Sequence, residues 1–245
     1  MTLDHIAQRL REAQRIAVLT GAGVSAESGV ATFRDPGGLW SKFSPYELAS
    51  MDGFLANPQR VWEWYQQRRQ IVEHVQPNPG HIALAEFERI IPHFTLITQN
   101  VDRLHQRAGS RSVLELHGNL EENRCVDCNK LHTGSIDTSV EEPPTCVHCG
   151  GRLRPNVVWF GEDLPRDVFH EAEAATTQCD VFMSIGTSAE VYPAADLPFR
   201  AKQFGAFVVE VNAGETALTP HVHAHLRGPS GEILPRLLAQ LTVNA

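Results

Sequence analysis

The sequence contains no apolar run that approaches the length of about 18 residues that a membrane-spanning helix needs. It also lacks an excess of positive charge, since 21 lysines and arginines stand against 29 aspartates and glutamates, for a formal net charge of −8. A nucleic-acid-binding protein needs a basic surface for phosphates. The charged first residues do not have the form of a signal peptide. We therefore expect a soluble globular protein with neither a membrane nor a nucleic acid as its partner.

Cysteine is scarce, and the total of five is odd, which argues against a framework of disulfides. Cys125 and Cys128, and then Cys146 and Cys149, form two C-x-x-C pairs separated by 17 residues. This spacing is typical of a zinc ribbon, in which four thiolates bind one Zn²⁺ tetrahedrally and leave no position for water. The predicted zinc is therefore structural. Thiols of this kind are typical of a reducing compartment, so we expect a cytoplasmic protein. Cys179, near a predicted strand, is expected to be a buried thiol.

A glycine-rich turn follows the first predicted strand, residues 16–20. Gly21, Gly23 and Ala26 have the spacing G-x-G-x-x-A, which suits a tight turn toward a pyrophosphate. A lone match of this kind is a weak signal. An ordinary dinucleotide unit continues with a second strand and an acidic residue about 20 positions later. Here residues 33–38 instead combine Phe33 and Arg34 with turn formers, a composition that predicts a flexible lid over a dinucleotide.

Polar or small residues also follow four later predicted strands, at 94–98, 113–116, 180–185 and 207–211. In open α/β sheets, ligands bind at the carboxyl ends of the strands. A histidine at a strand end can equally be structural, but its position at this edge favours a functional role. The residues at these strand ends are Gln99, Asn100, Asp102, His117, Gly186, Thr187, Ser188 and Asn212.

Predicted helices alternate with these strands, which indicates an α/β fold: a Rossmann-like, doubly wound, mostly parallel sheet. We expect helices near 3–13, 58–75, 79–87, 193–204 and 234–241. Two stretches break the alternation and predict an inserted small lobe with a helical module and a zinc ribbon. The expected large domain comprises 1–32, 77–121 and 155–245, and the small domain comprises 33–76 and 122–154.

The segment GAGVSAESGVATFR resembles the signature of the sirtuins, the NAD-dependent protein deacylases, and the other motifs of that family follow in order through nearly all 245 residues. The resemblance implies NAD⁺ as co-substrate and acylated lysines of proteins or peptides as substrates. It implies that His117 is the general base that activates a ribose hydroxyl. It also implies strand addition of the substrate to Val158, Phe160 and Gly161. The cofactor residues that it implies are Gly21, Ala22, Gly23, Ser25, Glu27, Phe33, Arg34, Trp40, Gln99, Asn100, Asp102, Gly186, Thr187, Ser188, Asn212 and Ser230.

Tyr65 and Arg68 share one face of the helix expected at 58–75. From spacing alone they are a core aromatic residue beside a solvated pair of arginines. The string VWEWYQQRR, however, resembles class III sirtuins, in which Tyr-x-x-Arg faces the acyl pocket and binds acyl groups that end in a carboxylate. Ala49 is small where a roomier pocket would need it. The resemblance thus implies a preference for succinyl- or malonyl-lysine over acetyl-lysine. Asn156 stands where close relatives have histidine, a departure expected to affect peptide preference.

Two other function classes are open: an NAD-dependent oxidoreductase with a structural zinc, and a zinc-ribbon adaptor that binds protein or nucleic acid. The acidic composition and the polar strand ends disfavour the adaptor. The missing acidic residue after a second strand and the glycine-rich break at 35–38 disfavour the oxidoreductase. We expect the protein to be a monomer.

Overall fold

The computed structural model describes residues 2–33, 38–132, 136 and 142–242. The six strands of the main sheet are all parallel, in the order β3-β2-β1-β7-β8-β9. Counted along the chain, this is the 3-2-1-4-5-6 order of a doubly wound dinucleotide-binding fold. The predicted fold class is confirmed. The strands of this sheet are β1 (Arg15–Thr20), β2 (His93–Thr98), β3 (Val113–Glu115), β7 (Val181–Ile185), β8 (Phe207–Asn212) and β9 (Ala224–Arg227).

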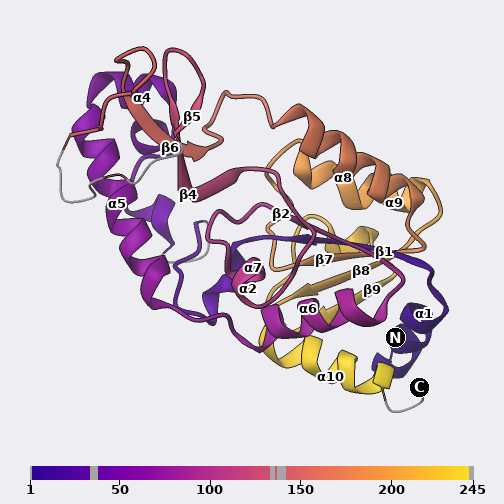
Figure 1. The fold of residues 1–245 in the computed structure, drawn as a ribbon. Coiled ribbons are helices and arrows are strands. Elements are labelled where there is room, and N and C mark those ends of the chain that lie inside the picture. The colour runs from indigo at the N-terminus through magenta and orange to yellow at the C-terminus, as the bar shows by residue number, and fades with distance from the viewer. Residues whose placement is uncertain (1, 34–37, 133–135, 137–141, 243–245) are drawn as a thin grey trace.

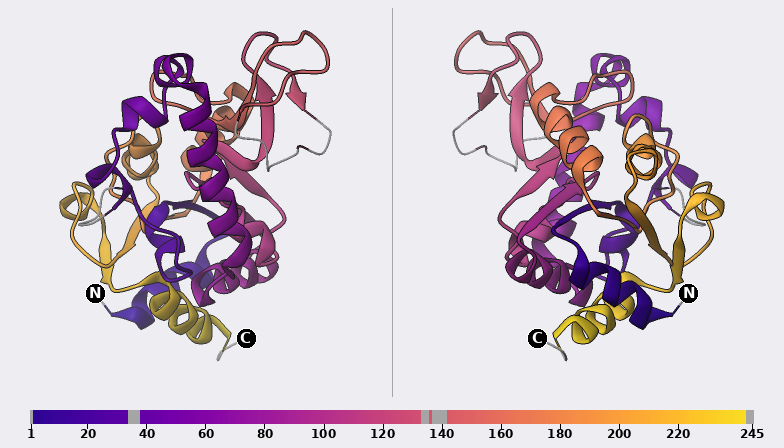
Figure 2. Two further views of the ribbon diagram at one scale, coloured as in Figure 1. Left: turned by 90° about the vertical axis from the view of Figure 1, so that its left-hand side faces the viewer. Right: turned by 90° about the vertical axis from the view of Figure 1, so that its right-hand side faces the viewer.

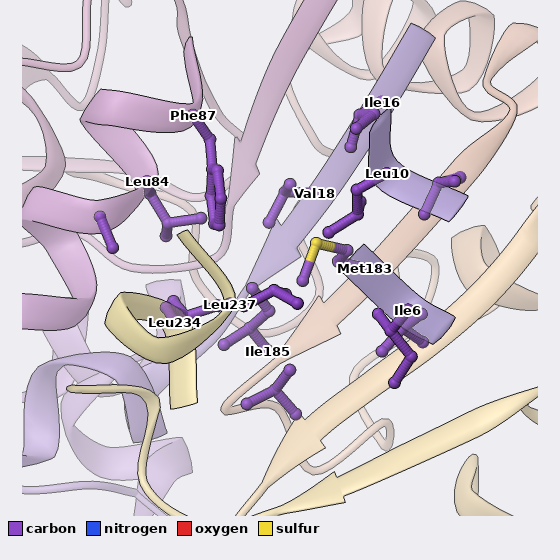
Figure 3. Close-up of a cluster of buried hydrophobic side chains, with 14 of the residues drawn as sticks. Ile6, Leu10, Ile16, Val18, Leu84, Phe87, Met183, Ile185, Leu234 and Leu237 are labelled. Atoms are coloured by element: carbon purple, nitrogen blue, oxygen red, sulfur yellow. The ribbon is translucent and has the colours of Figure 1, made fainter. Parts of the chain in front are cut away.

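Helices cover both faces of this sheet (Figure 1). On one face, Val18 and Ile185 point toward Leu84 and Leu237 from two covering helices (Figure 3). The alternate residues of the same strands, such as Leu19, pack on the other face. The first face is covered by α1 (Leu3–Glu12), α6 (Pro79–Ile90) and α10 (Ser230–Thr242), and the second by α8 (Arg166–Gln178) and α9 (Leu197–Gln203).

A second group of elements lies to one side of the main sheet (Figures 1 and 2). Its antiparallel sheet, in the order β5-β4-β6, packs beside a long helix, α5 (Pro58–His74). Arg69 joins the two, since it donates to the carbonyl of Leu120 and to the side chain of Asn123, both at 2.6 Å. The expected domain boundaries stay a prediction. The other members are η1 (Leu39–Ser41), α3 (Pro45–Leu48), α4 (Met51–Ala56), β4 (Gly118–Cys125), β5 (Leu131–His132) and β6 (Leu153–Val157).

Short helices occupy several of the loops. None of the helices in the described part of the chain combines the length and apolar character needed to cross a bilayer. The predicted helix at 58–75 is confirmed, with Asn57 as its N-cap. Helix α8 was not predicted, and α10 begins four residues before the expected position. The short helices are α2 (Ala22–Ala26), α7 (Leu104–Arg107), η2 (Ala194–Asp196) and η3 (Thr219–His221).

The four cysteines of the two C-x-x-C pairs converge, with all of their sulfur atoms within 4.8 Å of one another. The Sγ atoms of Cys125 and Cys149 are 3.4 Å apart, and those of Cys128 and Cys146 are 3.7 Å apart. A tetrahedron of thiolates about 2.3 Å from Zn²⁺ separates its sulfurs by about 3.8 Å, so these residues fit the ion. His148 is exposed at the second knuckle and is not part of this set.

The hydrophobic cluster at the tip of the three-stranded sheet is small in the described part of the chain. Among residues up to 132, residue 136 and residues from 142 onward, it contains Cys125, Cys146 and Leu153, with Cys128 and Ile136 packed against it. So small a core cannot supply much free energy of folding. Bound Zn²⁺ would therefore supply the stability of this tip through ligation.

We expect freshly purified protein to contain one Zn²⁺ per chain, measured by elemental analysis. Cys128→Ser should lose the metal and unfold the tip of the ribbon, because the free energy of ligation is free energy of folding there. Cys179→Ala is the matched control: this thiol is buried against the main sheet, in a different hydrophobic cluster, and its loss should leave the zinc content unchanged. Active protein without zinc would contradict the prediction.

Candidate active site

The site begins where the carboxyl ends of β1 and β7 touch, at the switch point of the sheet. The backbone N–H of Gly23 donates to the carbonyl of Gly186 at 2.8 Å. A Cβ atom on Gly21 would lie 2.8 Å from the Gly186 oxygen, and one on Gly23 would lie 2.8 Å from the Gly186 Cα. Gly186 itself has a φ of +60°. Only glycine permits this approach, and it leaves a backbone-lined cradle at the edge where nucleotides bind in such folds.

A cavity of about 770 Å³ extends from this cradle to α5. Its volume lies in the range of small-molecule sites. Most of the predicted site residues line it, although they come from widely separated stretches of the chain. They are Gly21, Ala22, Gly23, Glu27, Phe33, Ala49, Tyr65, Arg68, Gln99, Asn100, His117, Val158, Phe160, Gly161, Gly186, Thr187, Ser188, Asn212 and Ser230.

Four predicted cofactor residues are not among the lining side chains. Arg34, and with it most of the predicted lid, lies outside the described residues, as does the side chain of Trp40. Ser25 and Asp102 are buried directly behind the cavity wall. They therefore support the site from behind rather than contact a ligand in this structure.

A buried hydrogen-bond network fixes the side chain of Asn100. Its amide group donates to the Gly21 carbonyl at 3.0 Å and to the Ser25 hydroxyl at 3.2 Å, and Ser25 donates to Asp102 at 2.7 Å. Burial raises the pKa of the Asp102 carboxyl, and hydrogen bonds from Leu104 N–H and Ser25 partly offset this. Because both amide hydrogens of Asn100 are used inside the protein, its carbonyl oxygen is the group left to accept from a ligand.

Two buried histidines complete this network, and the sequence analysis missed both. Nδ1 of His81 accepts from the backbone N–H of Asn78 at 3.3 Å, so its Nε2–H can donate to Ser25 at 3.4 Å. Nε2 of His105 lies 2.9 Å from the Thr20 hydroxyl. Burial lowers the pKa of His81 to about 4 and that of His105 to about 3. Both rings are therefore neutral near pH 7 and serve as fixed hydrogen-bonding groups. Their helical positions carried no sequence signal.

His117 lies between β3 and β4 and lines the cavity. Its Nδ1 lies 3.0 Å from the carbonyl of Gln99. A carbonyl can only accept, so Nδ1 carries the hydrogen and Nε2 carries the lone pair in the neutral ring. The main chain is held on both sides, since Leu116 N–H donates to Thr98 and Val158 N–H donates to the His117 carbonyl, each at 2.9 Å. This tautomer suits a general base.

The segment after β6 forms the wall opposite the sheet. The N–H of Phe160 donates to the carbonyl of Ala49 at 2.9 Å, which ties this wall to the loop after α3. The ring of Phe160 contacts Tyr46, and both rings are exposed. The predicted pairing of this segment with a substrate strand stays a prediction. Asn156, expected to affect peptide preference, does not line the cavity; its side chain donates to Glu122 at 2.9 Å.

The end of the cavity against α5 holds two buried donors. Arg68 is 9% exposed, and its guanidinium lies 5.6 Å from the ring centre of Trp64. Within the described ranges no carboxylate pairs with it, and burial lowers its pKa. The interpretation of a solvated pair of arginines is therefore wrong, since Arg69 is held by Leu120 and Asn123. Tyr65 also lines this end, and its hydroxyl oxygen accepts from Trp159 Nε1 at 2.8 Å.

The other end of the cavity is shaped by loops after β7 and β8. Asn212 donates to the carbonyl of Thr187 at 2.9 Å, which joins the two loops. Glu27 accepts from Gly231 N–H at 2.8 Å and from Ser230 at 3.3 Å, so it holds the start of α10 rather than facing a ligand alone. This contact explains why α10 begins before the predicted position.

The arrangement agrees with comparisons to known proteins. The Sir2 family model matches residues 21–193. An NAD-dependent protein deacylase 2 of Pyrobaculum aerophilum is 48% identical, over 97% of this chain and 95% of its own length. An NAD-dependent protein deacylase of Aquifex aeolicus is 52% identical, over 86% of this chain and 89% of its own length.

Solved structures give the same result. A Sir2 homologue in complex with NAD is 44% identical with a TM-score of 0.92, covering 98% of this chain and 94% of that one. A Sir2 protein bound to a myristoylated histone peptide is 36% identical with a TM-score of 0.80, covering 99% and 97%. The matching sequence, topology and site together show that this chain belongs to the Sir2 family.

Proposed function

We propose that this chain is an NAD-dependent protein-lysine deacylase that transfers the acyl group of an acyl-lysine to ADP-ribose. One cavity is lined by a glycine cradle for the dinucleotide, by a histidine whose Nε2 carries the lone pair, and by two buried donors on α5. Acyl-lysine, NAD⁺ and one water would give the free lysine, nicotinamide and an O-acyl-ADP-ribose. An oxidoreductase, the alternative function, would not need a part of the cavity that receives an acyl group. Release of free nicotinamide, rather than absorbance at the dihydronicotinamide band, separates the two.

The residues of the site have distinct tasks in this reaction. NAD⁺ supplies a ribose hydroxyl as the acyl acceptor and nicotinamide as the leaving group. Asn100 presents its carbonyl oxygen to the nicotinamide amide, because Gly21 and Ser25 hold its amino group. His117 takes the proton of the ribose hydroxyl at Nε2, since Nδ1 is committed to Gln99.

We further propose that the preferred acyl groups end in a carboxylate, as in succinyl- and malonyl-lysine. The observation that supports this is the pair of buried donors at the closed end, the Arg68 guanidinium and the Tyr65 hydroxyl. A buried cation without a partner is unfavourable, and a carboxylate that enters an apolar pocket loses its hydration. A bound carboxylate would give the Arg68 cation its missing partner, and Arg68 would replace the hydration that the carboxylate loses. Arg68 offers a two-pronged donor that fits a carboxylate.

His117→Ala should lower kcat by roughly 10²–10⁴-fold, the usual contribution of a general base, while NAD⁺ binding persists. Turnover is measured with an acylated peptide, and cofactor binding is measured by calorimetry. His74→Ala is a suitable control, because that ring is exposed at the end of α5 and outside the cavity. If the His117 variant kept more than about a tenth of the turnover, the assignment of the base would be wrong.

Arg68→Met should lower kcat/KM for a succinyl-lysine peptide by about 30-fold to several thousand-fold. This follows from a loss of about 2–5 kcal/mol for one partner of a buried charge pair, at about 1.4 kcal/mol per decade. Activity on acetyl-lysine should stay the same or rise, since an uncharged group gains nothing from the cation. Tyr65→Phe should cause a smaller loss, limited to one hydrogen bond to a charged group, about 1.5–3 kcal/mol.

The matched control for this prediction is Arg69→Met. Arg69 adjoins Arg68 on α5 but donates to β4, so its loss should reduce thermal stability and affect both acyl substrates alike. If Arg68→Met also lowered activity on both substrates equally, Arg68 would have a structural role, and the proposed acyl preference would be refuted.

A further inference from the structure

We propose that Trp159 is a positioning residue for acyl groups that end in a carboxylate, because its indole N–H fixes the direction in which Tyr65 donates. This inference rests on the proposed function, specifically on the preference for such acyl groups. Trp159 lines the cavity beside Tyr65, and the sequence analysis did not assign it a role. Its backbone lies in the wall opposite the sheet, so it connects that wall to α5.

The hydrogen bond between the two rings has only one possible direction. Trp159 Nε1 lies 2.8 Å from the Tyr65 oxygen, and an indole nitrogen can only donate. The Tyr65 oxygen therefore accepts, and its own hydrogen must point away from Trp159. Across residues 2–33, 38–132, 136 and 142–242, no group accepts that hydrogen. Since Tyr65 is 3% exposed and lines the cavity, the cavity is where the donor is directed.

Trp159 is itself held rigidly, which a positioning residue requires. Its backbone N–H donates to Glu162 at 2.8 Å, and the guanidinium of Arg154 lies 3.4 Å from the centre of its ring. Arg154 and Glu162 form an ion pair, with a second contact at 2.9 Å. The ring of Phe54 packs on the same indole, 5.4 Å between centres. The indole N–H thus cannot turn away from Tyr65 without breaking several contacts.

The direction of donation matters because the hydroxyl stays protonated. Burial raises the pKa of Tyr65 above its ordinary value, even though the hydrogen bond from Trp159 acts in the opposite sense. Tyr65 is therefore a neutral donor near pH 7. Arg68 is three residues later on the same helix and lines the same end of the cavity. One carboxylate could then accept from both, and a donor aligned in advance loses less entropy when the ligand binds.

A simpler explanation is that Trp159 only packs in the core, as its burial of 98% would suggest for any large aromatic residue. The two explanations differ for Trp159→Phe, which keeps a ring in place but removes the N–H. If Trp159 only packs in the core, Trp159→Phe should lower kcat/KM by the same factor for every acyl substrate. If Trp159 positions Tyr65, the loss of kcat/KM should depend on the carboxylate of the substrate and on the Tyr65 hydroxyl.

The test is a double-mutant cycle with Trp159→Phe, Tyr65→Phe and the combined variant, each assayed on succinyl- and acetyl-lysine peptides. Trp159→Phe should raise KM for the succinyl peptide about 2- to 10-fold, the worth of one neutral hydrogen bond, with kcat unchanged. Kinetics on the acetyl-lysine peptide should change less than kinetics on the succinyl-lysine peptide, because an acetyl group has no carboxylate to accept from Tyr65. In the Tyr65→Phe background, Trp159→Phe should have no further effect on the succinyl peptide.

Additive losses, or equal losses on both peptides, would overturn the inference. If Tyr65→Phe lowers succinyl activity and Trp159→Phe does not, the proposed acyl preference stands and only the role of Trp159 is refuted. If Tyr65→Phe has no effect on the succinyl peptide, the role of Trp159 is refuted, whereas the proposed acyl preference is decided separately by Arg68→Met. The two single variants and the combined variant together distinguish these outcomes.

A measurement on the unsubstituted tryptophan covers the case in which Trp159→Phe does not fold. The chain has four tryptophans, so ¹⁵N-indole labelling gives four N–H signals. One of them should shift upfield in Tyr65→Phe protein, because it loses its acceptor. In the wild-type protein the same signal should respond to a succinyl-lysine peptide and not to an acetyl-lysine peptide. Equal responses to both peptides would overturn the inference.

Discussion

The contact between the ends of β1 and β7 is the constraint on which the site depends. Gly21 and Gly23 press against Gly186 at distances that no Cβ atom permits. Because these two strands are neighbours in the sheet yet their connections leave in opposite directions, the contact opens a crevice at the switch point. His117 lines this crevice, and so do the loops after β7 and β8. A side chain at any of the three glycines would have to push the strands apart or fill the cradle.

The closed end of the cavity depends on a different set of contacts. Arg69 fixes α5 on β4, and this in turn places Arg68 and Tyr65 at the cavity. Two adjacent arginines thus have opposite roles: Arg69 has its donors satisfied within the protein, whereas Arg68 is buried over Trp64 with no carboxylate beside it in the described chain. Leaving a buried donor unsatisfied lowers stability, and native proteins tolerate such groups mainly where a ligand uses them.

Local pattern was sufficient to predict much of this structure. Strand β1, helix α5 with its Asn57 cap, and the polar ends of β2 and β7 all follow from short-range periodicity and turn chemistry. Helix α8 was missed because it buries only Ala172 and Thr176, so its apolar stripe is weak. His81 and Trp159 were missed for another reason. Each acts through a partner more than 50 residues away, and no local pattern in one sequence reports such a contact.

The overall charge of the chain bears on the proposed selection of an anionic acyl group. With a formal charge of −8, the long-range field gives no attraction to a carboxylate and favours basic peptides instead. Ionic screening also limits the range over which exposed charges interact to about 8 Å under physiological conditions. Selection must then occur at short range, where burial removes the screening around Arg68. Arg68 can bind a carboxylate selectively only if the side chains around it are fixed. The Arg154–Glu162 ion pair holds the wall that includes Trp159. Under the proposed function, recognition of the acyl group and rigidity of the wall would therefore depend on the same contacts.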